Sequence, residues 1–243
     1  MAFWRAFECY CYSKEKIEGP TLDVGCGDGF FAQIVFEKPL EAGIDLDPLE
    51  VSKAEKSRSY HKVVHGSATE MPFPNRSFKT VISNCVLEHI PDIDAALGEI
   101  HRVLKPKGRL LITVPSECFN EDSFFKGLLR KIGLPVLGEK YLENLNSIFK
   151  HHHVDSSAVW KKRLKKAGFK MEKADYSIPV QAYHTYERWL IPAFPAKIFK
   201  ILFGRWVIGP RGPIKAFAAR WMKKTFQIQG DRGAVYFIVA QKG

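Results

Sequence analysis

The sequence contains no long apolar run, no closely spaced pair of cysteines and no low-complexity segment. A membrane-spanning helix needs about 18 or more consecutive, predominantly apolar residues, and charged residues interrupt every stretch of that length. The first residues lack a basic segment followed by an apolar one, so we expect no signal peptide. These absences favour a cytoplasmic protein.

Five cysteines are present, an odd number, and none forms a Cys-x-x-Cys pair that would predict a zinc or thioredoxin-like site. We therefore expect free thiols. The 243 residues are 46% hydrophobic and 26% charged, which is ordinary for a globular protein and excludes a disordered or collagen-like chain. We expect a single domain over 1–243, large enough to fold without disulfides or structural metals.

Segments with strand and helix patterns alternate along most of the chain. A helix is predicted over 1–18 and a helical insertion over 116–153. Between them, Asp47 and Asp92 precede helices as N-caps, and Pro48 stands at the favoured first helical position. Such alternation indicates a parallel sheet covered by helices on both faces. The predicted strands cover 21–24, 40–45, 62–65, 80–84, 109–114, 169–178 and 234–240, with a turn at 105–108.

A glycine-rich loop, Leu22-Asp23-Val24-Gly25-Cys26-Gly27-Asp28-Gly29, lies between the first strand and the next helix. The dinucleotide pattern Gly-x-Gly-x-x-Gly would need a glycine at Phe30. Asp23 and Asp28 would repel a pyrophosphate and suit a cationic ligand. Asp45, at the end of the second strand, is placed to accept the hydroxyl protons of a ribose. The ligand predicted from these residues is a nucleoside with a cationic tail.

These motifs resemble the class I S-adenosylmethionine-dependent methyltransferases, most closely the type 11-like, small-molecule branch that includes quinone and sterol enzymes. The likeness runs from about residue 19 to 115. Within that range it covers the segments 66–73, 78–84, 86–90 and 99–108, and a weaker similarity extends over 151–178 and the last strand. It implies a Rossmann-like, doubly wound α/β fold with a seven-stranded sheet, mostly parallel with the last strand antiparallel. Helical insertions would follow strands 5 and 6.

The resemblance implies S-adenosyl-L-methionine as cofactor and assigns a set of residues to its binding. These are Asp23, Gly25, Cys26, Gly27, Asp28, Asp45, Leu46, Ser67, Ala68, Met71 and Asn84. Two positions depart from the family pattern. Ser67 replaces an acid that accepts from the adenine amino group, and a hydroxyl accepts more weakly than a carboxylate. Lys79 replaces an aspartate, a change that we expect an exposed strand start to tolerate.

Methyl transfer to a small, apolar or lipid-like acceptor is the activity that the resemblance implies. The alternative is a non-catalytic module that binds the cofactor. His89, just past the fourth strand, is the candidate general base, or it packs beneath the 116–153 insertion. That insertion is either a lid over the acceptor or an ordinary packing element.

The run His151-His152-His153 invites comparison with metal sites. Three consecutive side chains point in different directions, so at most two of them share an ion. We therefore expect a surface loop here, with one histidine facing the substrate, and no metal site.

The positive charge is concentrated near the C-terminus. Residues 183–232 hold ten basic and two acidic residues, and thus eight of the eleven net positive charges. Two basic amphipathic helices are predicted there, and their apolar faces suit either an anionic membrane surface or the protein's own sheet. Nucleic acid is the less favoured partner because aromatic residues fall on the apolar faces and no nucleic-acid-binding motif is present.

If this stretch binds membranes, the purified protein will co-sediment with vesicles containing anionic lipid, and less protein will pellet as salt is raised. Neutral vesicles are the control. Absence of the protein from the pellet at every salt concentration would favour packing on the sheet.

Overall fold

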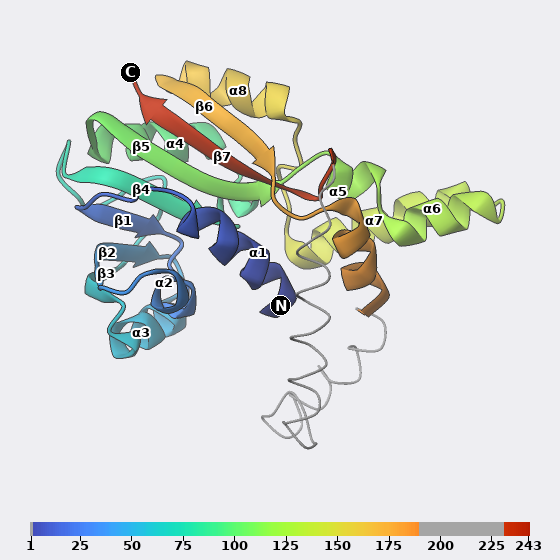
Figure 1. The fold of residues 1–243 in the computed structure, drawn as a ribbon, viewed down its shortest axis with the longest axis horizontal. Coiled ribbons are helices and arrows are strands. Elements are labelled where there is room, and N and C mark those ends of the chain that lie inside the picture. Colours follow the sequence, from blue (N-terminus) through green and yellow to red (C-terminus); the bar gives the residue numbers. More distant parts are fainter. Residues whose placement is uncertain (1, 190–230) are drawn as a thin grey trace.

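A computed structural model describes residues 2–189 and 231–243 (Figure 1). Its core is a seven-stranded sheet in the order β3-β2-β1-β4-β5-β7-β6. The strands from β3 to β5 are parallel, and β7 is antiparallel to both β5 and β6. This confirms the predicted Rossmann-like α/β fold. The strands are β1 (Thr21–Val24), β2 (Leu40–Asp45), β3 (Tyr60–His65), β4 (Phe78–Asn84), β5 (Leu104–Pro115), β6 (Phe169–Tyr176) and β7 (Val235–Lys242).

Helices cover both faces of the sheet because its central strands are apolar on both sides. In β4, Val81 joins one core cluster and its neighbour Ile82 joins the other, as the two-residue period of a strand requires. The first cluster includes α4 (Ile93–Val103) and α8 (Ser157–Lys166). The second includes α1 (Ala2–Ser13), α2 (Phe30–Val35) and α3 (Pro48–Ser57).

Two helix N-caps lie where the sequence predicts them, and the predicted turn at 105–108 is present as well. The Asp47 side chain accepts from Leu49 N at the start of α3, and Asp92 accepts from Ala95 N at the start of α4. The predicted turn at 105–108 falls inside β5. There Phe78 pairs with Leu104 and Thr80 pairs with Arg109, so the four turn residues form a bulge opposite the single residue Lys79. Lys79 is exposed and forms an ion pair with Glu18, as expected for a tolerated change.

The leading helix is shorter than predicted, ending at Ser13 rather than residue 18. Polar residues beyond its end bind the sheet instead of continuing the helix, and Glu15 pairs with Arg109 at 2.8 Å. Within α1, Tyr12 is buried against the sheet, and its hydroxyl donates to the carbonyl oxygens of Ser83 and Leu111. The N-terminal helix is therefore fixed across the ends of β4 and β5.

The 116–153 segment is helical, as predicted. It forms α5 (Cys118–Glu121), α6 (Phe124–Lys131) and α7 (Pro135–Phe149), which extend beyond one end of the sheet (Figure 1). The predicted strand over 169–178 is two residues too long, since β6 ends at Tyr176 and a helix covers 180–189. The two basic amphipathic helices expected within 183–232 fall in residues 190–230, outside the described residues.

The helix over 180–189 is joined to the preceding insertion by Glu187. This buried carboxylate accepts from Ser123 Oγ at 2.7 Å, Phe124 N at 2.5 Å and Tyr141 Oη at 3.1 Å. Tyr183 on the same helix is buried as well and donates to Phe119 O. The start of the predicted basic stretch thus packs on the protein, while Arg232 at its end pairs with Glu121 and Asp122.

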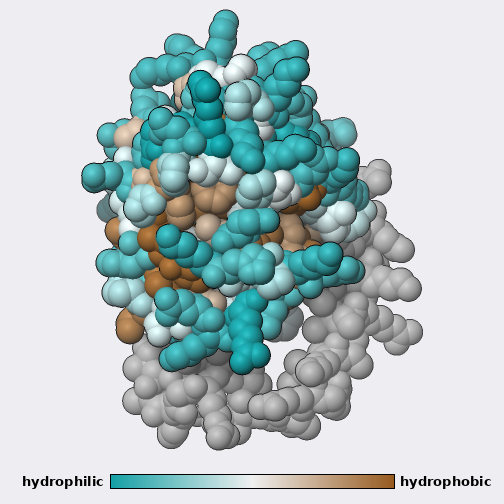
Figure 2. Space-filling model, turned by 90° about the vertical axis from the view of Figure 1, so that its left-hand side faces the viewer, coloured by the Kyte–Doolittle hydropathy of each residue, from teal (hydrophilic) through white to brown (hydrophobic). Residues whose placement is uncertain are grey.

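The outer surface is polar at the β3 edge of the sheet, where His61 and Lys62 are exposed. Charged side chains protect such an edge strand from pairing with another chain. Hydrophilic residues dominate the face shown in Figure 2, with apolar ones gathered across its middle. Among the described residues, no helix is long and apolar enough to cross a lipid bilayer.

Candidate active site

The glycine-rich loop joins β1 to α2 at the carboxyl ends of the parallel strands. Gly25, Gly27 and Gly29 have φ values of 76°, 53° and 78°, a region that disfavours residues with a Cβ. A Cβ at Gly25 would lie 2.3 Å from Val86 Cγ2, whereas one at Gly27 would have nothing within 4 Å. The loop is therefore tightly packed against the turn after β4 and open beside Gly27.

Asp45 at the end of β2 fixes the loop. One oxygen of its carboxylate accepts from Gly27 N at 2.8 Å, and the other accepts from Asp47 N at 2.9 Å. Each carboxylate oxygen has a second acceptor site, so the group retains capacity for two ligand hydroxyls. The next side chain, Leu46, is 70% exposed. A carboxylate with spare acceptor sites and an exposed apolar side chain thus follow one another at the end of β2.

The 66–73 segment adjoins Asp45, because Gly66 N donates to Asp45 O. Ser67 Oγ lies 2.7 Å from Thr69 Oγ1 and accepts from Thr69 N. Ala68 is partly buried against the core, and Met71 is almost fully buried in it. Of this predicted group, Ser67 and Ala68 are therefore nearer the surface than Met71.

Asp23 and Asp28 occupy opposite environments although both belong to the loop. Asp23 is buried and accepts from Tyr60 Oη at 2.7 Å. Desolvation raises the pKa of its carboxyl group from 3.8 to about 7. Asp28 is exposed and accepts from Phe30 N at the start of α2. Asp23 thus supports the loop from beneath, while Asp28 lies on its outer side.

At the end of β4, Asn84 and the following Cys85 bind a carboxylate from the N-terminal helix. Glu8 accepts from Asn84 Nδ2 and from Cys85 Sγ, both at 2.9 Å, and burial raises the pKa of Glu8. Glu8 is not among the residues that the sequence predicts for the site. Its only signal is an acid between apolar residues of the first helix, which does not reveal a partner 76 residues away.

The turn after β4, η1 (Leu87–His89), brings a second group of polar side chains to this edge. Glu88 is buried, and desolvation raises its pKa to about 8. The His89 ring, whose pKa burial lowers, stacks on His151 with centroids 5.4 Å apart. Burial, together with His89, lowers the pKa of His151 to about 4. His89 therefore contacts the end of the 116–153 insertion, which is the contact expected if His89 packs beneath that insertion.

The three consecutive histidines diverge, as predicted. His151 faces His89, whereas His153 Nε2 lies 3.0 Å from Ile90 O and its Nδ1 contacts Arg163. His152 is exposed. The segment 151–153 therefore contributes one side chain, His151, to the candidate site.

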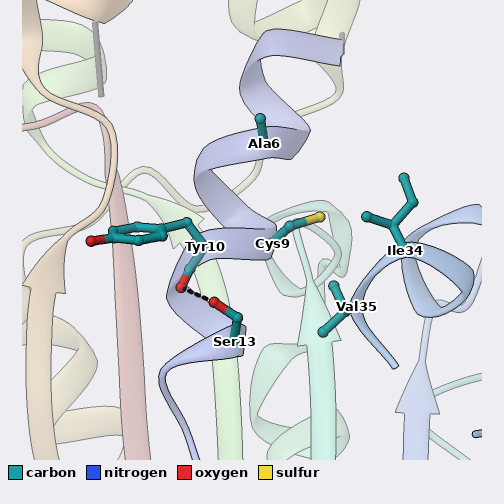
Figure 3. A pocket seen from close by; sticks show the side chains of 6 residues that line it. All are labelled: Ala6, Cys9, Tyr10, Ser13, Ile34 and Val35. Carbon is teal, nitrogen blue, oxygen red and sulfur yellow. Dashed lines mark hydrogen bonds between the residues drawn. The ribbon is translucent and has the colours of Figure 1, made fainter. Parts of the chain in front are cut away.

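A separate hollow of about 420 Å³ lies between α1 and α2. Figure 3 shows the side chains that line it: Ala6, Cys9, Tyr10, Ser13, Ile34 and Val35. The set contains no carboxylate or imidazole, and desolvation raises the pKa of Cys9 to about 11. This hollow therefore lacks the acid–base groups found at the carboxyl edge of the sheet.

Comparison with known proteins agrees with the fold and with the loop. Residues 22–112 match the family model described as a methyltransferase domain. The chain is 30% identical over 190 residues to the demethylmenaquinone methyltransferase of Chlorobaculum tepidum, covering 72% of this chain and 75% of that protein. The chain belongs to the class I S-adenosylmethionine-dependent methyltransferases, and S-adenosyl-L-methionine is its cofactor.

Two further proteins show how far the similarity extends. A demethylmenaquinone methyltransferase of Staphylococcus aureus is 40% identical over 137 residues, which are 51% of this chain and 55% of that protein. The chain thus spans just over half the length of that relative. A Thermotoga maritima structure described as a possible histamine N-methyltransferase aligns with a TM-score of 0.65 and 19% identity, covering 100% of this chain and 90% of the other. At that identity it shows the shared fold.

The buried Asp23 makes stability depend on pH. Its pKa is higher in the native state than the ordinary 3.8 of an exposed aspartate, so the native state holds more protons between that value and about pH 7. The free energy of unfolding contributed by Asp23 therefore falls as pH rises through this window. We expect that in Asp23→Asn the free energy of unfolding, measured with urea at a series of pH values, decreases less steeply as pH rises. The exposed Asp28→Asn serves as control, and an unchanged slope in Asp23→Asn would contradict the assignment.

Proposed function

We propose that this enzyme transfers the methyl group of S-adenosylmethionine to a small, apolar or lipid-like acceptor bound beside the turn after β4. The observation that carries the proposal is the Asp45 carboxylate, held at 2.8 Å from Gly27 N next to the exposed Leu46. An acceptor for a ribose, an apolar contact for adenine and an open backbone loop occur together there. The names of the relatives add support, because demethylmenaquinone is an apolar ring compound with a lipid tail.

The proposed cofactor contacts divide by position. Asp45 accepts the ribose hydroxyls, and Leu46, Ser67 and Ala68 border the adenine. Gly25, Gly27, Asp28 and Asn84 border the amino-acid end, together with the backbone of Cys26, whose side chain is buried. Asp23 and Met71 act from beneath, since both are buried. When bound, S-adenosylmethionine supplies a methyl group that its sulfonium already activates, so the protein's main task is to align an acceptor with it.

On the acceptor side, the insertion over 116–153 forms the proposed lid. Its helices and the turn between α6 and α7 carry exposed apolar side chains: Leu128, Ile132, Leu134, Val136, Leu137 and Ile148. Such a surface suits an apolar acceptor more than a polar one. His89 lies where the insertion meets the turn after β4. Its Nδ1 lies 3.2 Å from Lys150 O, and a carbonyl only accepts, so Nδ1 carries the proton and Nε2, which lies 3.7 Å from Glu88 Oε1, is the nitrogen that would act as a base.

We also propose that an anionic lipid surface is approached through residues 183–232, in a cytoplasmic protein. The support is the net charge of this stretch in the sequence. Its described ends take part in the fold, through Glu187 and Arg232, so the proposal depends on the residues between them.

Cofactor binding tests the assignment of Asp45. Calorimetry with S-adenosylmethionine is expected to show one site, and Asp45→Ala is expected to weaken binding about 10- to 100-fold, because a hydrogen bond to a charged group contributes about 1.5–3 kcal/mol. Glu55→Ala, an exposed acid on the adjacent α3, is the matched control. Equal affinity in the wild type and in Asp45→Ala would contradict the assignment.

Transfer itself is tested with S-adenosylmethionine labelled in the methyl group and a panel of quinol, phenol and fatty-acyl acceptors. Label is expected in an apolar product. If His89 is the base, His89→Ala lowers kcat by about 10²- to 10⁴-fold, since a positioned base contributes that much, and leaves cofactor affinity unchanged. Cofactor binding without transfer to any acceptor would favour the non-catalytic module.

A further inference from the structure

Two adjacent side chains and a third from much later in the chain converge at the end of β4. Glu88 and His89 come from η1, and His151 follows α7. One potential ligand atom of each lies within 4.8 Å of the others. We infer that Glu88, His89 and His151 form a binding site for a divalent transition metal ion such as Zn²⁺. This inference departs from the expectation of no metal site and uses only one member of the triple-histidine run.

The orientation of the two imidazoles supports the inference. His89 Nδ1 donates to Lys150 O, and His151 Nδ1 lies 3.0 Å from Asn146 Oδ1. The Asn146 amide is itself oriented, because its Nδ2 donates to Asn120 Oδ1 at 2.9 Å. Both histidines therefore carry their proton on Nδ1 and keep a lone pair on Nε2. A metal-binding histidine typically shows this arrangement, in which an outer oxygen accepts from the other ring nitrogen.

Glu88 provides the second, independent observation. The residue is 1% exposed, and its Oε2 has no hydrogen-bond partner among the described residues. Its other oxygen lies 3.7 Å from His89 Nε2, too far for a hydrogen bond. A buried carboxylate oxygen without a partner is costly. A cation between the carboxylate and the two lone pairs would satisfy all three groups.

The donor set also defines the class of ion. Two imidazole nitrogens and one carboxylate oxygen match the three protein ligands of many catalytic zinc sites, with a fourth position left for an oxygen ligand. Bonds of about 2.0–2.2 Å place tetrahedral ligand atoms about 3.4 Å apart. The His89–Glu88 separation of 3.7 Å is close to that value, and His151, whose ligand atom lies within 4.8 Å of the other two, must turn toward them to complete the set.

The position of the cluster suggests what occupies the open coordination position. Val86 packs on Gly25 of the cofactor loop, and Glu88 and His89 follow within three residues. The ion would thus lie at the same edge of the sheet as the cofactor, with an oxygen of water or of the methyl acceptor as its fourth ligand. In that arrangement His89 holds the ion instead of acting as a free base.

The experiment measures metal binding alone, so its outcome does not depend on methyl transfer. The full chain, with any affinity tag cleaved, is stripped with a chelator and titrated with Zn²⁺ by calorimetry and with Co²⁺ by visible absorption. We expect one ion per chain and the absorption bands of low-symmetry, four-coordinate Co²⁺. Glu88→Gln and His151→Ala are expected to weaken binding at least 100-fold, and the neighbouring His152→Ala to leave it unchanged.

Circular dichroism and S-adenosylmethionine binding of each variant separate loss of the metal site from loss of the fold. No binding of either ion to the wild type overturns the inference. So does binding that survives in Glu88→Gln and His151→Ala, or binding that His152→Ala weakens equally. If Glu88→Gln fails to fold, His151→Ala with retained cofactor binding decides the outcome.

Discussion

The geometry of the candidate site depends on the hydrogen bonds that the carbonyl oxygen of Ile44 accepts. It accepts from Gly25 N at 2.8 Å and from Cys26 N at 3.1 Å, and so fixes the chain after β1 against the end of β2. This arrangement requires a positive φ at Gly25, which few residues other than glycine adopt. Once the loop takes this course, Gly27 N meets the Asp45 carboxylate, and Gly25 lies against Val86. The glycine-rich loop, Asp45 and the turn after β4 are positioned together.

The layered fold follows from the sequence because its determinants are local. Strand and helix periods, the caps Asp47 and Asp92, and the glycine pattern each depend on a few neighbouring residues. The position of Asp45 beside the glycine-rich loop was predictable for the same reason, since the carboxyl ends of adjacent parallel strands meet. The burial of individual side chains was harder to predict from the sequence. The resemblance groups Asp23 and Met71 with Asp45, yet both are buried, because the hydroxyl of Tyr60 and the core beneath the 66–73 segment occupy their surroundings.

Contacts between distant segments are what the sequence did not reveal. Glu8 meets Asn84 and Cys85, and His151 meets His89, across separations that no periodic pattern encodes. The consecutive residues His151, His152 and His153 illustrate both what the sequence predicts and what it does not. Their divergence follows from backbone geometry alone, whereas the choice of His151 as the one that faces His89 depends on where α7 ends. The functional edge of the molecule is therefore defined by tertiary packing around a locally encoded loop.

The buried Glu187 carboxylate joins the described start of the second insertion to the first. Its three donors all belong to the first insertion, at Ser123, Phe124 and Tyr141, while the carboxylate belongs to the second. Exchanging either insertion alone between homologous enzymes would leave a desolvated acid without donors, or donors without an acid. Glu187 and its three donors therefore constrain one another, and a change on either side of the carboxylate is expected to require a matching change on the other.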